Sequence, residues 1–209
     1  MNRLVRSVEM SKVAQPKTQR GRESRAAIVR AAAQLMYKRG VRATSVDDVL
    51  IAAGAGKSQL YHYFEAKEDL AAAVLEHQLA EVLQQQTAFR LDTWTGLREW
   101  FDALVDGQRA RAHRGCPVGS IAPEMSAMSD DMAARVGAAF AHWQRTLAEA
   151  FTEMQRRDRL AHGASVDMLA AVTLAQIQGG YLLSTATQTT DPMAHALDAA
   201  YATLRAYRP

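Results

Sequence analysis

Residues 44–70 constrain the fold of this chain more than any other stretch, with the sequence TSVDDVLIAAGAGKSQLYHYFEAKEDL. The spacing of apolar residues predicts a short helix over 46–53, a turn at Gly54 and a second short helix over 57–64. A longer helix is expected to begin near Lys67 and to follow the second one directly. Two short helices joined by a glycine turn are typical of a helix-turn-helix.

The residues around these helices support the same interpretation. Ser45 is a good N-cap for the first short helix, and Asp48 three residues later gives a weak capping box. An amphipathic helix over 22–39 is expected before it, with Gly40 as its C-terminal stop. We therefore expect a helix-turn-helix domain over 22–66.

The charge is distributed unevenly along the chain. Residues 1–66 hold 12 Lys and Arg against 5 Asp and Glu, whereas the remainder holds 13 against 17. A basic first third on an acidic body indicates that the first third meets a polyanion. Residues 1–21 are expected to form a flexible basic arm, either a solvated tail or a segment that contacts phosphates or the minor groove. The basic residues of the arm are Arg3, Arg6, Lys12, Lys17 and Arg20.

The second short helix has the residue types that DNA recognition requires. Its first turn is small or polar, and a glutamine there can bond adenine N6 and N7. Tyrosine, histidine and lysine further along can donate to phosphates, and a helix N-terminus also favours a phosphate. One of Tyr61 and Tyr63 is expected to pack in the core instead. The residues predicted to contact DNA are Thr44, Ser45, Lys57, Ser58, Gln59, Tyr61, His62, Tyr63 and Lys67.

Residues 67–209 are alanine-rich and repeatedly amphipathic, with no convincing strand alternation, so the fold class is all-α. Pro117 is expected to open a short helix. The chain has no run of about 18 uncharged apolar residues, which argues against a membrane span. A single cysteine cannot form an intramolecular disulfide, and a reducing, cytoplasmic location is expected. The other helices are expected over 67–86, 94–113, 129–159, 166–187 and 193–206.

The run AAGAGKSQLYHYFEAKEDL resembles the recognition segment of the tetracycline-repressor (TetR) family of bacterial transcriptional regulators. The resemblance covers residues 22–75. It implies nine or ten helices, a homodimer built on the last two long helices, and a ligand cavity inside the C-terminal domain, residues 67–209. Family members often have serine at the position of Gly56 and a small residue at that of Gln59. The operator sequence therefore does not carry over.

The last two expected helices have small and apolar residues at helical spacing. Gly179 and Gly180 each cost about 1 kcal/mol against alanine inside a helix, and the close approach of a second helix would explain that cost. Two such helices from each of two chains would form a four-helix interface, although both could also pack inside a monomer. The residues predicted at a dimer interface are Leu169, Thr173, Gly180, Leu183, Leu197, Tyr201 and Leu204.

The segment 115–128, GCPVGSIAPEMSAM, resembles a stretch that helps to wall the ligand cavity in a subset of the family. Methionine and aromatic side chains suit apolar ligands, although their residue types favour core packing, and a pocket lining and a core overlap in composition. The residues predicted to bind a small hydrophobic effector are Trp100, Phe101, Leu104, Cys116, Met125, Phe140, Trp143 and Gln176.

Cys116 is either a small buried hydrophobe or a sensor of electrophiles and oxidants, its pKa lowered by a helix N-terminus at Pro117. No catalytic motif, cofactor motif or standard metal-ligand spacing is present, and Glu124 is expected on a solvated face. We therefore expect no enzyme, cofactor or metal. The leading hypothesis is a ligand-responsive repressor that binds a palindromic operator as a homodimer. The alternatives are a redox-sensing repressor that acts through Cys116 and an architectural DNA-binding protein without an effector.

Overall fold

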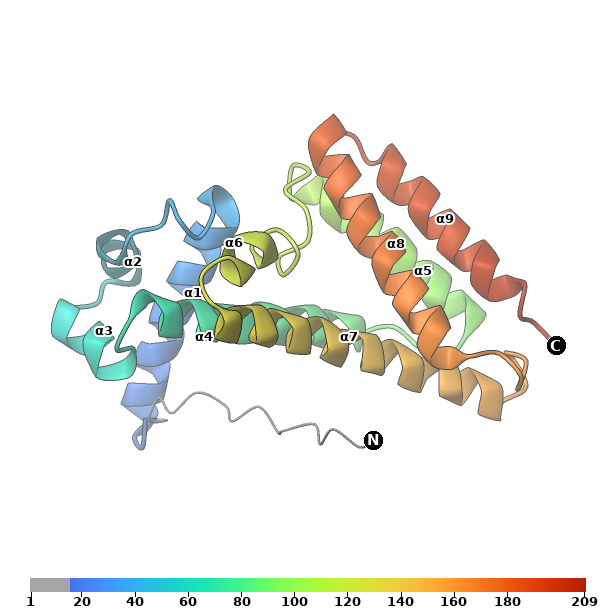
Figure 1. Cartoon of the computed structure of the whole chain (residues 1–209), viewed down its shortest axis with the longest axis horizontal. Helices are drawn as coiled ribbons and strands as arrows, with labels where there is room; N and C mark the ends of the chain where they lie inside the picture. The colour runs from blue at the N-terminus through green and yellow to red at the C-terminus, as the bar shows by residue number, and fades with distance from the viewer. Residues whose placement is uncertain (1–15) are drawn as a thin grey trace. The chain divides into compact units, whose positions relative to one another are not determined.

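The computed structural model describes residues 16–209, and every regular element in that range is a helix (Figure 1). Arg3, Arg6 and Lys12 of the expected arm lie outside the described residues. The nine helices of the described range are α1 (Gln19–Arg39), α2 (Val46–Ala53), α3 (Lys57–Tyr63), α4 (Lys67–Gln86), α5 (Trp94–Ala110), α6 (Ala122–Ser126), α7 (Asp130–Arg156), α8 (Val166–Thr187) and α9 (Asp191–Arg205). The all-α prediction is confirmed.

Three of these bounds differ from the prediction in informative ways. The first helix begins at Gln19, inside the expected arm, because the Thr18 side chain accepts a hydrogen bond from the Gly21 N–H at 3.1 Å and caps it. Pro117 opens a series of turns rather than a helix, and α6 starts five residues later. The last helix includes Pro192 in its first turn, where a missing N–H does no harm.

The chain forms two compact units, whose boundaries fall inside α4, α6 and α7. The first unit holds the chain up to His77 together with Pro123–Gly137. The second unit holds Gln78–Ala122 and Ala138–Pro209. The first unit therefore contains more than the predicted module 22–66, because the start of α4, most of α6 and the start of α7 pack with it.

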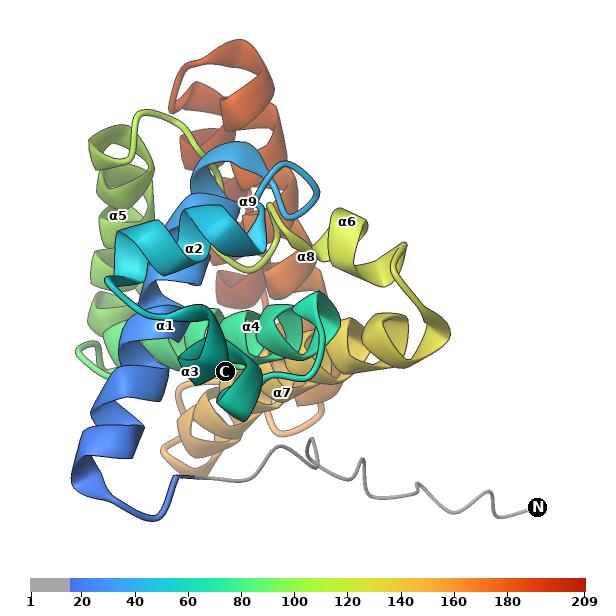
Figure 2. The same ribbon diagram turned by 90° about the vertical axis from the view of Figure 1, so that its left-hand side faces the viewer.

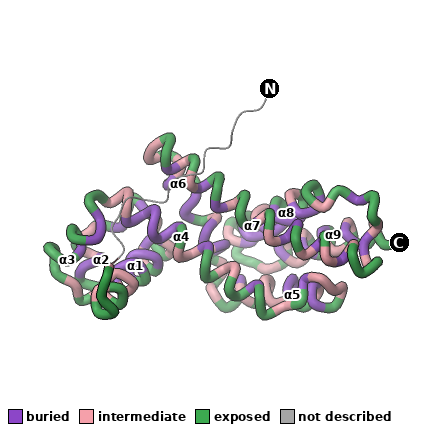
Figure 3. The backbone as a smooth tube through the Cα atoms, turned by 90° about the horizontal axis from the view of Figure 1, so that it is seen from below, coloured by how far each residue is buried: buried purple, intermediate pink, exposed green. Residues whose placement is uncertain are grey.

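In the first unit, α1, α2 and α3 pack against one another around a shared core (Figure 2). Ile28 of α1, Val49 of α2 and Phe64 after α3 are fully buried. Burial of one such side chain stabilises the fold by about 1.5–3 kcal/mol, so these contacts outweigh the weak intrinsic helicity of two short helices. Figure 3 shows that the inward sides of these helices are buried while their outer sides are exposed.

In the second unit, α9 packs back along α8, and α5 packs against α9. Gly180 makes the first contact possible, because a Cβ there would lie only 3.1 Å from the Met193 Cα. Farther along, the buried Trp143 indole N–H donates to Gln86 Oε1 at 3.0 Å and fastens the end of α4 to α7. Among the described residues, α8 alone is long and apolar enough to cross a membrane by length and composition.

Candidate DNA-binding surface and effector domain

Helix α3 has a buried side and an exposed side. Leu60 and Tyr63 are buried against α1 and α2. Lys57, Ser58 and Gln59 in its first turn are exposed, and so are Tyr61 and His62. The exposed side chains can donate and accept hydrogen bonds. One face of α3 therefore presents polar groups that do not pack in the core. This is the arrangement that a helix needs in order to enter the major groove.

The turn between the two short helices is built by local chemistry. The Ser45 side chain accepts from the Asp48 N–H, and the Asp48 carboxylate accepts from the Ser45 N–H, each at 3.1 Å, so the expected capping box is present. The hydrogen bonds from Ser45, with further help from Arg39, lower the pKa of Asp48 and keep it ionised. Gly54 closes α2 with a φ of 62°, the left-handed conformation expected of it.

Two residues predicted to contact DNA are buried. Thr44 is completely buried, and its hydroxyl donates to the Gly40 carbonyl at 2.8 Å, so it holds the turn before α2. Tyr63 is 6% exposed and contacts the Phe64 ring edge-on, whereas Tyr61 is 51% exposed. The expectation that one of the two tyrosines packs in the core is met by Tyr63, and the proposed DNA surface loses Thr44 and Tyr63.

The two lysines of this surface already have partners within the first unit. Lys57 lies 3.5 Å from an Asp47 carboxylate oxygen, but both side chains are exposed, so this pair contributes little stability. Lys67 donates from Nζ to the Arg42 carbonyl at 3.3 Å. An ammonium has three donors, and this bond leaves two for a phosphate.

Two further contacts of this surface escape sequence reasoning. The amide nitrogen of Gln59 donates to the hydroxyl of Ser24 on α1. Glu124 of α6, expected on a solvated face, is only half exposed and accepts from the Arg42 N–H at 2.7 Å. Each contact joins residues far apart in the chain, and no local pattern predicts either of them.

The residues predicted at a dimer interface lie mostly inside the single chain. All of them except Leu183 and Tyr201 are buried within the single chain, so the predicted interface is corrected at the buried positions. The exposed positions of α8 recur every three or four residues and form a separate apolar stripe. We call this the α8 stripe; it consists of Met168, Val172, Ala175, Gly179, Leu182 and Leu183, with Gly179 half-buried and the others exposed.

The predicted effector residues are largely core. Trp100, Phe101, Cys116, Met125 and Trp143 are buried, whereas Leu104, Phe140 and Gln176 are half-buried. The amide oxygen of Gln176 is buried without a hydrogen-bond partner among the described residues. A buried acceptor without a partner costs about 1–3 kcal/mol, so this atom marks a place where a ligand or a second chain would be stabilising.

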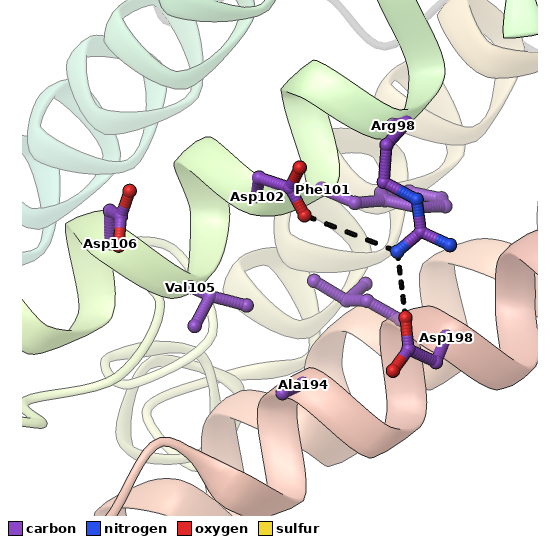
Figure 4. Close-up of a pocket in the computed structure, with 8 residues that line it drawn as sticks. Arg98, Phe101, Asp102, Val105, Asp106, Ala194 and Asp198 are labelled. Carbon is purple, nitrogen blue, oxygen red and sulfur yellow. Dashed lines mark hydrogen bonds and ion pairs between the residues drawn. The ribbon is translucent and has the colours of Figure 1, made fainter. Parts of the chain in front are cut away.

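An open cleft of about 300 Å³ lies between α5 and α9, and Phe101 is the one predicted effector residue that lines it (Figure 4). Arg98 crosses the cleft and lies 2.6 Å from an Asp198 carboxylate oxygen and 4.0 Å from one of Asp102. These ion pairs are partly exposed and therefore weak. The residues predicted for an effector cavity do not gather here, and that cavity stays a prediction.

The environment of Cys116 differs from that of a reactive thiol. Its side chain is 2% exposed, and the Gln178 amide nitrogen lies 3.6 Å from the sulfur. Burial raises the pKa of the Cys116 thiol, although hydrogen bonds from Gly119 and Gln178 partly oppose it. The expected lowering by a helix N-terminus is wrong, because turns rather than a helix follow Pro117. The neutral, enclosed thiol is a poor nucleophile at neutral pH.

We therefore predict that mild peroxide or a quinone will not act on the protein through Cys116. In the native protein the thiol should react with Ellman's reagent only about as fast as the chain opens, and rapidly in urea. Operator affinity of the wild type and of Cys116→Ser should respond alike to either oxidant. Release of DNA by the wild type alone would contradict this prediction and restore the sensor hypothesis.

Comparison with known proteins agrees with the geometry. Residues 28–74 match the family described as bacterial regulatory proteins, tetR family. Residues 93–199 match the C-terminal domain of LmrA/YxaF-like transcriptional regulators. Together the two matches span the surface around α3 and most of the second unit.

Individual relatives agree along most of the chain. The chain is 30% identical over 179 residues to an uncharacterized HTH-type transcriptional regulator in the lacX 3′ region of Lactococcus lactis subsp. lactis, covering 80% of this chain and 86% of that protein. It is 31% identical over 173 residues to the transcriptional regulator AcuR of Cereibacter sphaeroides, covering 79% and 78%.

A solved structure of the regulatory protein TetR from Rhodobacter sphaeroides superimposes with a TM-score of 0.75 at 26% identity, covering 86% of this chain and 97% of that one. Both halves of the chain, and the order of its helices, are accounted for by these matches. The chain belongs to the TetR family: it is a helix-turn-helix transcriptional regulator and not an enzyme.

Proposed function

We propose that this regulator is a repressor that binds a palindromic DNA operator as a homodimer and is released by a small hydrophobic effector. The exposed polar side of α3 carries the proposal, because its outer residues have no role in the core. Lys57, Ser58 and Gln59 would approach base edges, while Tyr61 and His62 would donate to phosphates. A regulator of chromosomal DNA in a bacterium would act in the cytoplasm.

The homodimer is proposed from the α8 stripe. Leu182 is 70% exposed, and a Cβ added at Gly179 would meet no atom of residues 16–209 within 4 Å. A glycine costs about 1 kcal/mol against alanine in a helix, and no contact in the described part of the chain explains that cost here. A second copy of α8 that crosses close to Gly179 would explain why glycine stands there. It would also explain why α8 is long and apolar without a need for the helix to cross a membrane. A two-fold pair would present two copies of α3 to half-sites whose centres lie about 34–36 Å apart, or a multiple of that.

The proposal that an effector controls DNA binding rests on the position of α6 in the chain and on its contact with Arg42. The loop before α6 belongs to the second unit, and Glu124 within α6 is bonded to the Arg42 N–H beside the helix-turn-helix. Gly40 lies against the same carboxylate, because a Cβ there would be 2.5 Å from Glu124 Oε1. A ligand that displaces the loop would pull on this bond and shift α2 and α3 out of their DNA-binding positions.

The proposed function assigns a base contact to Gln59 of α3 and a phosphate contact to Lys67 of α4, and this difference can be tested. Gln59→Ala should lower the ratio of operator affinity to random-DNA affinity by about tenfold, because one base contact is lost. Lys67→Ala should weaken binding to both DNAs about equally and reduce the salt slope by about one. Anisotropy titrations on both duplexes at several salt concentrations measure these changes. Equal losses on both DNAs for both variants, with no small-molecule effect, would favour the architectural alternative.

A further inference from the structure

The hydroxyl of Ser24 lies on α1, outside the helices α2 and α3, yet it is the hydrogen-bond partner of Gln59, which the proposed function places against a base. Ser24 is half-buried on α1, and Gln59 is exposed in the first turn of α3, 35 residues away. The bond runs from Gln59 Nε2 to Ser24 Oγ. The side chain of Gln59 is therefore held by the scaffold at its outer end as well as at its Cα.

We propose that Ser24 determines base specificity by orienting the Gln59 amide for adenine; this inference rests on the proposed operator binding. A glutamine amide can present its oxygen and nitrogen in either order, and only one order matches the N6 donor and N7 acceptor of adenine. In this structure the amide nitrogen is the atom that bonds Ser24, and this is the order that the proposal requires. The amide nitrogen has two protons, so one remains for N7, and the oxygen remains free to accept from N6.

The position of Ser24 makes this arrangement rigid. The residue lies within α1, and α1 packs directly against α3. Ser24 has few rotamers, whereas Gln59 alone would lose several side-chain torsions on meeting a base. Because the bond to Ser24 fixes the Gln59 side chain before DNA binds, that entropic cost is lower. The Ser24–Gln59 bond should therefore increase discrimination between bases more than it increases affinity for all DNA sequences.

The experiment is a selection from a randomised duplex pool with full-length wild type, Ser24→Ala, Ser24→Thr, Gln59→Ala and the double variant. The wild type should prefer adenine at one symmetric position in each half-site. Ser24→Ala should reduce that preference about 3- to 10-fold, the value of one hydrogen bond. Ser24→Thr keeps the hydroxyl and should restore the preference. In the Gln59→Ala background, Ser24→Ala should change the preference by less than about twofold.

Three outcomes would overturn the inference in separate ways. An unchanged adenine preference in Ser24→Ala would remove the positioning role. Equal weakening on all sequences, with or without Gln59, would mean that Ser24 contacts a phosphate instead. A preferred base other than adenine would contradict the selected order of the amide atoms. If the wild type enriches no sequence at all, the proposed operator binding itself fails. Glu23→Ala, a change at the exposed neighbouring position on α1, serves as the matched control.

Discussion

A Leu182→Arg variant is expected to fold as the wild type does, to run as a monomer, and to bind the operator about 100-fold more weakly. Leu182 is 70% exposed, so a charge there costs the isolated chain little. In the proposed dimer the same charge would be buried in an apolar interface without a partner, which is strongly unfavourable. One helix-turn-helix reads only a half-site. A monomer therefore lacks the affinity that a dimer gains by binding two linked half-sites at once.

Sedimentation and anisotropy on an operator duplex measure the two effects in the same sample, and circular dichroism checks the fold. Gln84→Arg provides the control, because it places the same charge at an exposed position of α4 outside the α8 stripe. It should stay dimeric and bind as the wild type does. A Leu182→Arg protein that remains a dimer with unchanged affinity would show that the α8 stripe is not the interface.

A Gly40→Ala variant is expected to lower the free energy of unfolding by about 1–3 kcal/mol and to weaken operator binding. Gly40 has φ 91° and ψ 161°, a conformation that is essentially restricted to glycine. Its Cβ would also press on the carboxylate that accepts from the Arg42 N–H. The turn that sets the start of α2 would therefore have to move.

Urea unfolding and operator titration test the variant, and Gly137→Ala is the matched control. Gly137 lies in α7 at an exposed position, and a Cβ there meets no described atom within 4 Å. Alanine is about 0.5–1 kcal/mol more favourable than glycine inside a helix, so the control should be slightly more stable than the wild type. If Gly40→Ala were also stabilised and bound DNA normally, the role assigned to the turn would be wrong.

The helices that the sequence predicted best are those with local signals at both ends. The second helix has the predicted bounds, Val46–Ala53, because Ser45 caps its start and Gly54 takes the left-handed conformation at its end. Neither signal depends on the rest of the chain. The short helix expected from Pro117 had only a proline as its signal, and turns formed there instead.

The orientation of α8 could not be predicted from its sequence, because the helix is apolar on two sides. Leu169 and Leu182 are equally good core residues by type, yet one is buried and the other is exposed. Periodicity reveals a helix and its faces, but it does not reveal which face meets α9 and which meets a second chain. The long-range hydrogen bonds of Ser24, Gln86 and Glu124 could not be predicted for a related reason, because each polar partner lies dozens of residues away in the sequence.

Hydrogen exchange of the full-length protein, with and without a duplex selected from a random pool at low salt, tests the central claim most directly. The account predicts that the duplex protects Gly56–Lys67 most strongly, on both chains, over two symmetric half-sites. Protection confined to other segments, or a protein that retains no duplex even at low salt, would contradict the placement of α3 in the major groove.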